Sequence, residues 1–280
     1  MARKIELPSL SPVSCLLSVF RFLHLNQRAF VKIAVCIKRV PEMDVKFKIA
    51  PSGVAVDEAG LKFDMSDFDG YAVEFALQTT EKLGAGEVVV ISLGPDVVQE
   101  TLRKALSMGV GRAVHLKADT VPMDGFAIAQ ALAAELKDGG YDLILFGKHA
   151  ADSASGTVGL MTAELLGIPM VQACTKLSFA DGKGTARREV EGGAEMVSFP
   201  LPAAASIDEG IARPRYPSLK GIMAAKKKPM DVKPAQLGAV RLSVARMELP
   251  AERQAGRIIG DGAAAVPELV RLLRDEAKVI

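Results

Sequence analysis

Short apolar runs alternate with longer amphipathic segments from residue 31 onward. Such runs are typical of strands buried on both faces of a sheet, and four of them lie at 32–37, 87–92, 112–116 and 141–146. After each run, apolar residues recur at helical spacing, which predicts helices over about 66–83, 94–108, 124–136 and 155–166. Strands that alternate with helices predict an α/β fold, in which a parallel sheet with right-handed crossovers carries helices on both faces.

The pattern changes after the fourth predicted helix. Three strand-like runs, 171–179, 185–191 and 195–201, are separated by short glycine-containing turns, so we expect them to pair antiparallel. Residues 208–234 then lose periodicity and carry four prolines and a basic run, a composition that predicts an extended arm. A last amphipathic helix fits 264–278.

The first 30 residues differ from the rest, because four Lys and Arg residues accompany a single acid and the apolar part is short and interrupted. We expect the natural chain to begin at Val31, since a GTG start codon reads as valine in a conceptual translation. The alternative is an arginine-rich organellar presequence. In either case we expect 1–30 to be a poorly packed extension, 31–210 to be an α/β domain, and 211–280 to be an arm that ends in the final helix.

Composition excludes several classes of protein. Hydrophobic residues make up 49% and charged residues 24% of the 280 residues, as in soluble globular chains, and no apolar run is long enough to cross a membrane. The formal net charge of +2 argues against a polycation built for nucleic acid, and the chain has no Trp and only three Tyr for stacking on bases. Three cysteines and three histidines are scattered, which argues against a disulfide framework or a zinc site and fits a reducing compartment.

The connection after the fourth predicted strand is rich in small side chains. Residues 147–158 read GKHAADSASGTV, where a strand-to-helix connection usually needs only about two to six residues. Ligands of parallel α/β sheets bind beyond the carboxyl ends of the strands, and free N–H groups at a helix N-terminus attract anions. Small residues let a phosphate approach the backbone, so the loop predicts a phosphate or nucleotide site. The alternative is a long surface loop with a serine cap.

Better-known nucleotide motifs are missing from the sequence. There is no GxxxxGK[ST], and Gly109-Val110-Gly111 lacks a third glycine and leads into a strand rather than out of one. His149 is the only histidine in the predicted loop, and the sequence assigns no carboxylate partner to it. We therefore expect a histidine that contacts a ligand or solvent rather than a catalytic base.

A second stretch, 216–223, places apolar residues in the predicted arm. Leu219, Ile222 and Met223 have few neighbours in sequence that could bury them. They either pack onto the chain's own domain or form an apolar anchor for a partner protein. The basic run 226–228 nearby is compatible with binding of phosphate or of an acidic partner, and equally with a solvated surface.

Six stretches of the chain, in the same order, resemble one known family. They are VKIAVCIKRVPE (31–42), DFDGYAVEFAL (67–77), SLGPDVVQETLRKALSMGVGRAVHL (92–116), GKHAADSASGTVG (147–159), RREVEGGAE (187–195) followed by Leu201-Pro202-Ala203, and RPRYPSLKGIMAAKKKP (213–229). On these motifs, which span about 31–230, the chain resembles the β subunit of electron transfer flavoprotein.

The resemblance implies a fold, a partner and nucleotides. A β subunit of this family has an adenine nucleotide α-hydrolase-like nucleotide-binding domain and forms a heterodimer with an α subunit that holds the redox-active FAD. In most members the β subunit binds AMP as a structural nucleotide. By position, the residues implied to bind it here are Cys36, Ser66, Asp67, Phe68, Asp69, Gly147, Lys148, His149, Ala150, Ala151, Asp152, Ser153, Ala154, Ser155, Gly156, Thr157 and Val158.

The resemblance also implies an electron carrier subunit rather than an enzyme. Electrons would come from acyl-CoA dehydrogenases and similar donors, as in fatty acid oxidation, and would pass to an electron transfer flavoprotein-quinone oxidoreductase. Leu219 falls at the anchor of the family's recognition loop for these donors, with Tyr216, Ile222 and Met223 beside it. Glu189 falls where the family has a glutamate that can pair with the mobile FAD domain of the α subunit.

Several positions depart from the family's pattern. Ser66-Asp67 stands where Asn-Pro is common, His149 and Thr157 stand where Gln is usual, and Ser153-Ala154 stands where acids are usual. The alternatives are therefore FAD in this subunit in place of AMP, as in an electron-bifurcating NADH-using or nitrogen-fixation-type flavoprotein, and a nucleotide-hydrolysing or adenylyl-transferring enzyme. We expect a cytoplasmic protein if the source is bacterial and a mitochondrial matrix protein if it is eukaryotic.

Overall fold

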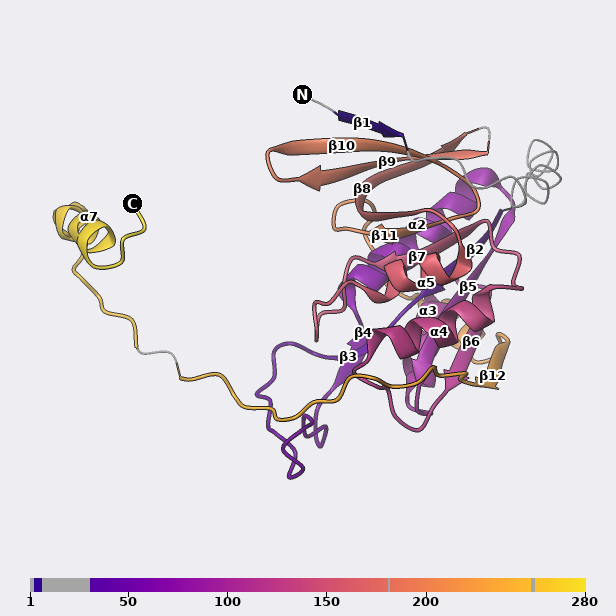
Figure 1. The fold of residues 1–280 in the computed structure, drawn as a ribbon, viewed down its shortest axis with the longest axis horizontal. Coiled ribbons are helices and arrows are strands. Elements are labelled where there is room, and N and C mark those ends of the chain that lie inside the picture. Colours follow the sequence, from indigo (N-terminus) through magenta and orange to yellow (C-terminus); the bar gives the residue numbers. More distant parts are fainter. Residues whose placement is uncertain (1–2, 7–30, 181, 253–254) are drawn as a thin grey trace. The chain divides into compact units, whose positions relative to one another are not determined.

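The computed structural model describes residues 3–6, 31–180, 182–252 and 255–280 (Figure 1). Their contacts divide the chain into two compact units. The first joins residues 1–47 to 58–245, and the second joins 48–57 to 246–280. The predicted boundaries after residues 30 and 210 remain predictions.

One sheet of ten strands forms the frame of the first unit. Its spatial order is β1 (Arg3–Glu6), β10 (Gly193–Pro200), β9 (Lys183–Val190), β8 (Met170–Ala180), β11 (Ala203–Ile207), β7 (Leu143–Gly147), β2 (Val31–Cys36), β5 (Gly86–Gly94), β6 (Arg112–Lys117) and β12 (Met230–Pro234). A separate antiparallel pair joins β3 (Arg39–Pro41) to β4 (Phe63–Met65).

Most neighbouring strands of this sheet are parallel. Every pair from β8 across to β12 is parallel, whereas β8, β9 and β10 pair antiparallel. The sequence pattern predicted both regions, and both predictions are confirmed.

Helices cover both faces of the sheet, as the alternation predicted. They are α2 (Asp67–Leu83), α3 (Val98–Met108), α4 (Gly125–Leu136) and α5 (Val158–Leu166). Along β2, Ile33 and Val35 belong to the core cluster that contains residues of α2 and α3, whereas Ala34 and Cys36 belong to the cluster that contains residues of α4 and α5. This alternation arises because successive strand side chains point to opposite faces. The parallel strands are therefore buried on both sides (Figure 1).

The order of the strands reverses next to β2. The chain passes from β2 through α2 to β5, then through α3 to β6, and α4 returns it to β7 on the other side of β2. In an open α/β sheet such a reversal leaves a crevice beyond the carboxyl ends of the two strands, where ligands usually bind. The ends of β2 and β7 are therefore the place to search for a site.

Several elements of the first unit were not predicted, among them β11, α6 and β12. β11 lies between β7 and β8, and all five of its residues are buried, including the small side chains of Ala203, Ala204 and Ala205. Beyond it, α6 (Leu219–Ala225) and the edge strand β12 lie within the stretch that lacks periodicity. A seven-residue helix and a five-residue edge strand are too short for a periodic signal to stand out.

The two ends of the chain contain few regular elements among the described residues. Residues 3–6 form β1 alongside β10, and the rest of the predicted N-terminal extension lies outside the described residues. In the second unit, a 3₁₀ turn over Ala263–Ala265 leads into α7 (Val266–Asp275), which confirms the last predicted helix. Among the described residues no helix is both long and apolar enough to span a membrane.

Candidate functional site

The side-chain carboxylate of Asp69 connects the carboxyl ends of β2 and β7, where the strand order reverses. Asp69, in the first turn of α2, accepts a hydrogen bond from the Lys38 N–H at 2.7 Å and another from the Gly147 N–H at 3.0 Å. The first donor follows β2 and the second ends β7. Asp69 thus bridges two neighbouring strands where their own ladder stops.

The same carboxylate is costly to bury. Burial raises the pKa of Asp69 from its ordinary value of 3.8 to about 7, although the two N–H donors and nearby Lys38 act in the opposite direction. The neighbouring Cys36 thiol is also affected, because burial and the negative charge of Asp69 both raise its pKa. Cys36 is therefore a packed thiol at the floor of the site, not a thiolate nucleophile.

The loop between β7 and α5 is fastened to the start of α2. The Ser66 hydroxyl accepts a hydrogen bond from the Ala151 N–H at 3.3 Å and donates to the His149 carbonyl oxygen at 3.5 Å. The Phe68 ring lies 4.5 Å from the His149 ring, centroid to centroid. Residues that the sequence placed in one site from two distant stretches, 66–69 and 147–151, are therefore in contact.

Two ion pairs tie the loop to other strand ends. Lys38 Nζ lies 2.7 Å from Asp152, and Lys148 Nζ lies 2.8 Å from Asp208, which follows β11. Sequence reasoning did not include Lys38 and Asp208 in the site. Each stands one or two residues beyond the carboxyl end of a strand, and that rule alone identifies them. Lys38 therefore compensates the negative charge of Asp152, which reduces the repulsion between Asp152 and an anion at the loop.

Gly147 is small for a different reason from the one the sequence suggested. A Cβ atom at this position would lie 2.4 Å from Asp69 Oδ1 and 2.8 Å from both the Asp69 nitrogen and Phe68 Cβ. The space beside Gly147 is thus filled by the start of α2. Access of a phosphate to the backbone depends on the later part of the loop, 153–158.

Replacing Gly147 with alanine is expected to lower the free energy of unfolding by about 1–3 kcal/mol, because the new methyl group must displace the backbone at the start of α2. Gly193→Ala is the matched control, since a Cβ atom there meets no atom within 4 Å and Gly193 does not adopt a positive φ. Urea denaturation of both variants measures the effect. Equal stabilities would show that α2 can move aside without cost.

The later part of the loop can accept an anion. Gly156 adopts a φ of +60°, and Thr157, at the N-terminus of α5, makes no side-chain capping hydrogen bond. The first N–H groups of a helix have no intrahelical partner, so α5 offers free donors and the positive end of its dipole. His149 Nδ1 is buried without a hydrogen-bond partner among the described residues. These groups fit the phosphate of a nucleotide.

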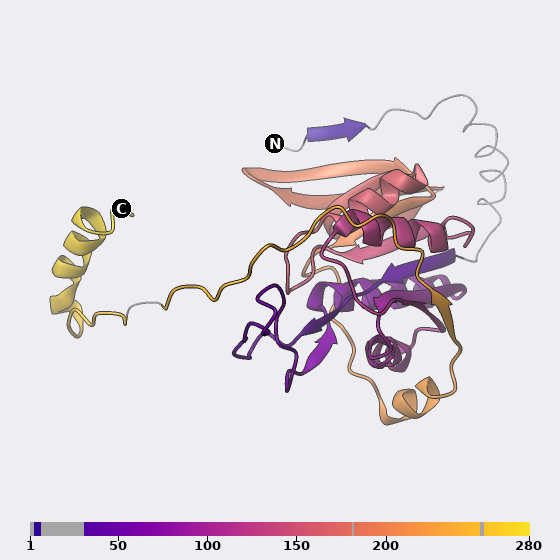
Figure 2. The same ribbon diagram turned by 60° about the horizontal axis from the view of Figure 1, so that its bottom comes forward.

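The second predicted group of residues lies on a separate surface. Tyr216 and Leu219 are 93% and 80% exposed, and Ile222 and Met223 are also exposed. They lie on or just before α6, the orange helix at the bottom of Figure 2. The interpretation that these side chains pack onto the chain's own domain does not hold for the first unit described here. Their exposure leaves these side chains available for contact with another molecule.

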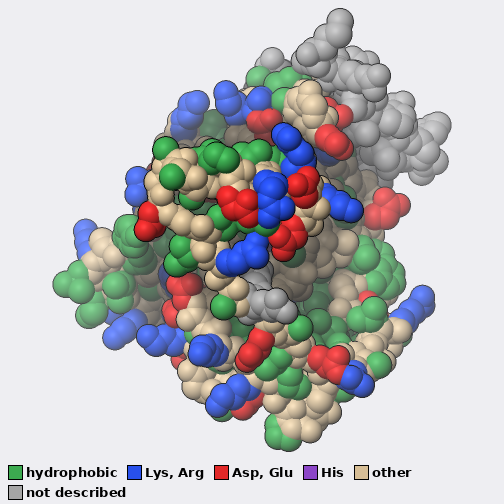
Figure 3. Space-filling view, turned by 90° about the vertical axis from the view of Figure 1, so that its left-hand side faces the viewer, with side chains coloured by type: hydrophobic (Ala, Val, Ile, Leu, Met, Phe, Trp, Pro, Cys, Tyr) green, Lys and Arg blue, Asp and Glu red, His purple; other side chains and the backbone are tan. Residues whose placement is uncertain are grey.

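Glu189 lies away from that apolar cluster. It is on β9, near one end of the sheet, where it forms an ion pair with Arg187, whereas α6 packs on α3 near the other end. Lys and Arg side chains are interspersed with Asp and Glu on the face drawn in Figure 3.

The segment that leads to α6 is tethered to α2 by Arg215. Its Nε donates to Glu74 Oε2 at 2.8 Å, and its Nη1 donates to Glu81 at 2.6 Å. Burial alone would raise the pKa of Glu74, but hydrogen bonds from Arg215 and Gln78 hold it below its usual range. Sequence reasoning missed this cluster, because Arg215 stands 141 residues from Glu74 and 134 residues from Glu81 along the chain.

Comparison with known proteins gives a consistent family. The family model described as "Electron transfer flavoprotein domain" matches residues 53–237. The chain is 36% identical over 250 residues to the electron transfer flavoprotein subunit beta of Syntrophomonas wolfei, which covers 89% of this chain and 98% of that protein. It is 36% identical over 266 residues to the subunit beta of Bacillus subtilis, covering 89% and 100%. It is 37% identical over 257 residues to the mitochondrial subunit beta of Oryza sativa subsp. japonica, also covering 89% and 100%.

Proposed function

Because the chain belongs to the electron transfer flavoprotein β-subunit family, we propose that it binds AMP as a structural nucleotide and docks electron donors for a FAD-carrying α subunit. The α subunit would hold most of the FAD, which would supply the electron-carrying chemistry when bound. Donors of the acyl-CoA dehydrogenase type would deliver them, and an electron transfer flavoprotein-quinone oxidoreductase would receive them. The observation that carries the proposal is the pairing of a loop site at the carboxyl ends of β2 and β7 with a separate exposed apolar surface on the same sheet domain.

The nucleotide part of the proposal rests on the reversal point. Ser66 and Asp69 hold the 147–151 part of the loop near the ends of β2 and β7, and residues 153–158 lead from there to the start of α5. The unpartnered His149 Nδ1 and the uncapped helix suit a phosphate. The Lys38–Asp152 pair limits repulsion of that phosphate by the loop's own acid.

Nucleotide content of the purified heterodimer tests this part. Acid release followed by chromatography is expected to give one FAD and one AMP per heterodimer. Two FAD and no AMP would replace the proposal by the electron-bifurcating type, in which FAD occupies this subunit. No nucleotide beyond the FAD of the α subunit would exclude a nucleotide role for the loop.

The docking part rests on exposure and on the shape of the surface. Four apolar side chains, those of Tyr216, Leu219, Ile222 and Met223, project from one short helix and the residues before it. Leu219 is the most exposed of the three aliphatic ones. A projecting aliphatic side chain suits insertion into an apolar pocket on a partner, where buried anchors supply most of the binding free energy.

Replacing Leu219 with alanine is expected to weaken donor docking by about 1–3 kcal/mol, which raises the KM for the heterodimer as electron acceptor. Leu165→Ala is the control, because Leu165 is also exposed but lies on α5, on the other face of the sheet. Steady-state reduction by an acyl-CoA dehydrogenase measures both. The flavin content of both variants should be unchanged. An unaltered KM in Leu219→Ala would remove Leu219 from the docking surface.

A further inference from the structure

The short helix α6 buries very little of its own surface. It has seven residues, of which only Ala225 is buried. An isolated helix of this length is not stable in water. A groove of about 560 Å³ separates part of α6 from α3, lined by residues that include Ser107, Pro217 and Ile222. Within α6, apolar packing in the core therefore comes from Ala225 alone.

Two cations join the ends of α6 and α3 reciprocally. Arg103, on α3, donates through Nη1 to the carbonyl oxygens of Ala225 at 2.6 Å and Lys228 at 3.0 Å. Lys228 in turn donates through Nζ to the carbonyl oxygens of Leu106 at 2.9 Å and Val110 at 2.7 Å, at the end of α3. Each side chain thus satisfies carbonyl groups at the C-terminal end of the other helix, where cations are most favourable.

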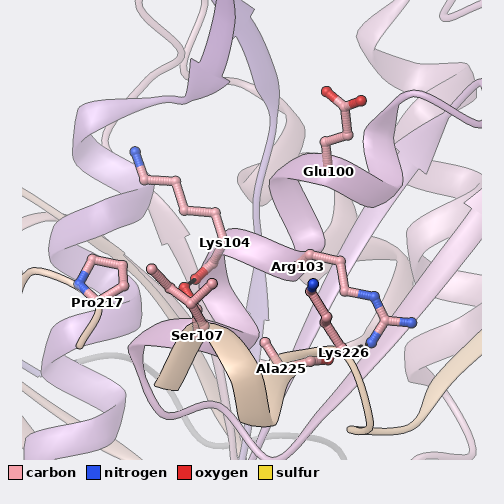
Figure 4. Close-up of a pocket in the computed structure, with 8 residues that line it drawn as sticks. Glu100, Arg103, Lys104, Ser107, Pro217, Ala225 and Lys226 are labelled. Carbon is pink, nitrogen blue, oxygen red and sulfur yellow. Dashed lines mark hydrogen bonds between the residues drawn. The ribbon is translucent and has the colours of Figure 1, made fainter. Parts of the chain in front are cut away.

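Figure 4 shows the difference between the two basic residues of α3 that border the groove. Arg103 reaches toward the ribbon at the end of α6, whereas Lys104 points away from it. Lys104 forms an ion pair with Asp64 instead. Gly221 adds a second contact, because a Cβ atom there would lie 2.4 Å from the Ser107 carbonyl oxygen. The close approach of the two helices depends on this glycine.

The three lysines of the basic run consequently differ. Lys228 is half-buried, and burial lowers its pKa, whereas Lys226 and Lys227 are exposed. The side chains of Lys226 and Lys227 make no hydrogen bond or ion pair within the part of the chain that the structure describes. Only these two remain available for contacts with another molecule.

From these contacts we infer that Arg103 and Lys228 are positioning residues of the docking surface, which lock α6 onto α3 so that Leu219 and its neighbours are presented preformed to the electron donor. The inference rests on the proposed docking function. A preformed surface avoids the entropy cost of ordering the loop at the moment of binding. Loss of either side chain should therefore weaken docking without removing any atom that touches the partner.

The test uses the complete heterodimer and an acyl-CoA dehydrogenase. Arg103→Met and Lys228→Met are each expected to raise the KM for the heterodimer roughly five- to tenfold with little change in kcat, in line with loss of two charge-assisted hydrogen bonds. Lys137→Met is the control, since Lys137 is exposed, stands at the end of α4 on the other face of the sheet, and its side chain makes no hydrogen bond or ion pair with the described residues. FAD and AMP contents should match those of the wild type. Arg103→Lys, which keeps the charge but loses the planar fork, should be intermediate.

Two further measurements separate positioning from general destabilisation. Amide hydrogen exchange over 219–225 should become faster in Arg103→Met, while exchange over the strands of the sheet stays unchanged. In a Leu219→Ala background, Arg103→Met should weaken docking little further, because the Leu219 side chain that Arg103 helps to position is already absent. Full additivity of the two losses would overturn the inference.

The outcomes also separate this inference from the proposed function. The inference is refuted if Arg103→Met and Lys228→Met both leave the KM and the hydrogen exchange over 219–225 unchanged. If the wild-type heterodimer accepts no electrons from the dehydrogenase, the proposed docking function fails. Hydrogen exchange then still decides whether Arg103 and Lys228 hold α6.

Discussion

Replacing Arg215 with methionine is expected to lower the free energy of unfolding by about 3–5 kcal/mol, the range seen when one partner of a buried ion pair is removed. Glu74 is only 3% exposed, and Arg215 donates to both of its oxygens. Without the guanidinium, the carboxylate keeps hydrogen bonds from Gln78 and from the backbone N–H of residue 215, but no cationic partner among the described residues. A buried charge left in that state is strongly unfavourable.

The design of the experiment depends on two further variants. Arg213→Met is the matched control, because Arg213 is exposed, stands two residues away and makes no hydrogen bond or ion pair within the described residues. The double variant Glu74→Met/Arg215→Met should recover much of the lost stability, since removing both partners leaves no orphan charge. Urea denaturation gives all four values. A double variant as unstable as Arg215→Met alone would show that packing, not charge, causes the loss.

The second large effect concerns pH. The pKa of Asp69 is 3.8 in a solvated carboxyl group and about 7 in the folded chain. Between these values the folded chain holds a proton that the unfolded chain has released, so stability falls as pH rises. The contribution of Asp69 is greatest below about pH 4 and is lost as the pH passes 7. A difference of about three pH units corresponds to on the order of 4 kcal/mol.

Asp69→Asn removes this titration. The difference in free energy of unfolding between wild type and variant should therefore shift against the wild type by on the order of 4 kcal/mol between pH 4 and pH 8, measured by urea denaturation at several pH values. The control is Asp138→Asn, an exposed carboxyl group without hydrogen bonds to the described residues. A wild-type-to-variant difference that does not depend on pH would mean that the Asp69 carboxyl group is not buried as described.

How far the sequence predicted the fold depended on the type of signal. The strands β2, β5, β6 and β7 were predictable because each is a short apolar run followed by a helical period. β11 was not, since Ala203–Ile207 reads as a loop of small residues after a proline. Its small side chains suit a strand that lies between two neighbours and under helices on both faces. That requirement comes from tertiary packing and leaves no local pattern.

The sequence predicted where the candidate site lies but not the contacts that hold it together. The loop 147–158 and the stretch 66–69 could be located from the carboxyl-end rule and from the resemblance to a family. The function of Asp69 as a joint between strand ends, and the reason for Gly147, could not. Both depend on which strand ends adjoin the start of α2, and that follows from the sheet order alone.

The position of β11 has a consequence for how the chain is made. β11 is the last of the interior strands to leave the ribosome, yet β7 and β8 can reach their final partners only when it has arrived. A nascent chain that stops before residue 207 exposes two apolar strand edges, which are templates for intermolecular pairing. Premature termination or slow translation in this region should therefore yield insoluble aggregates rather than a partly functional fragment, and early chaperone binding to the stretch around β8 would be a selective advantage.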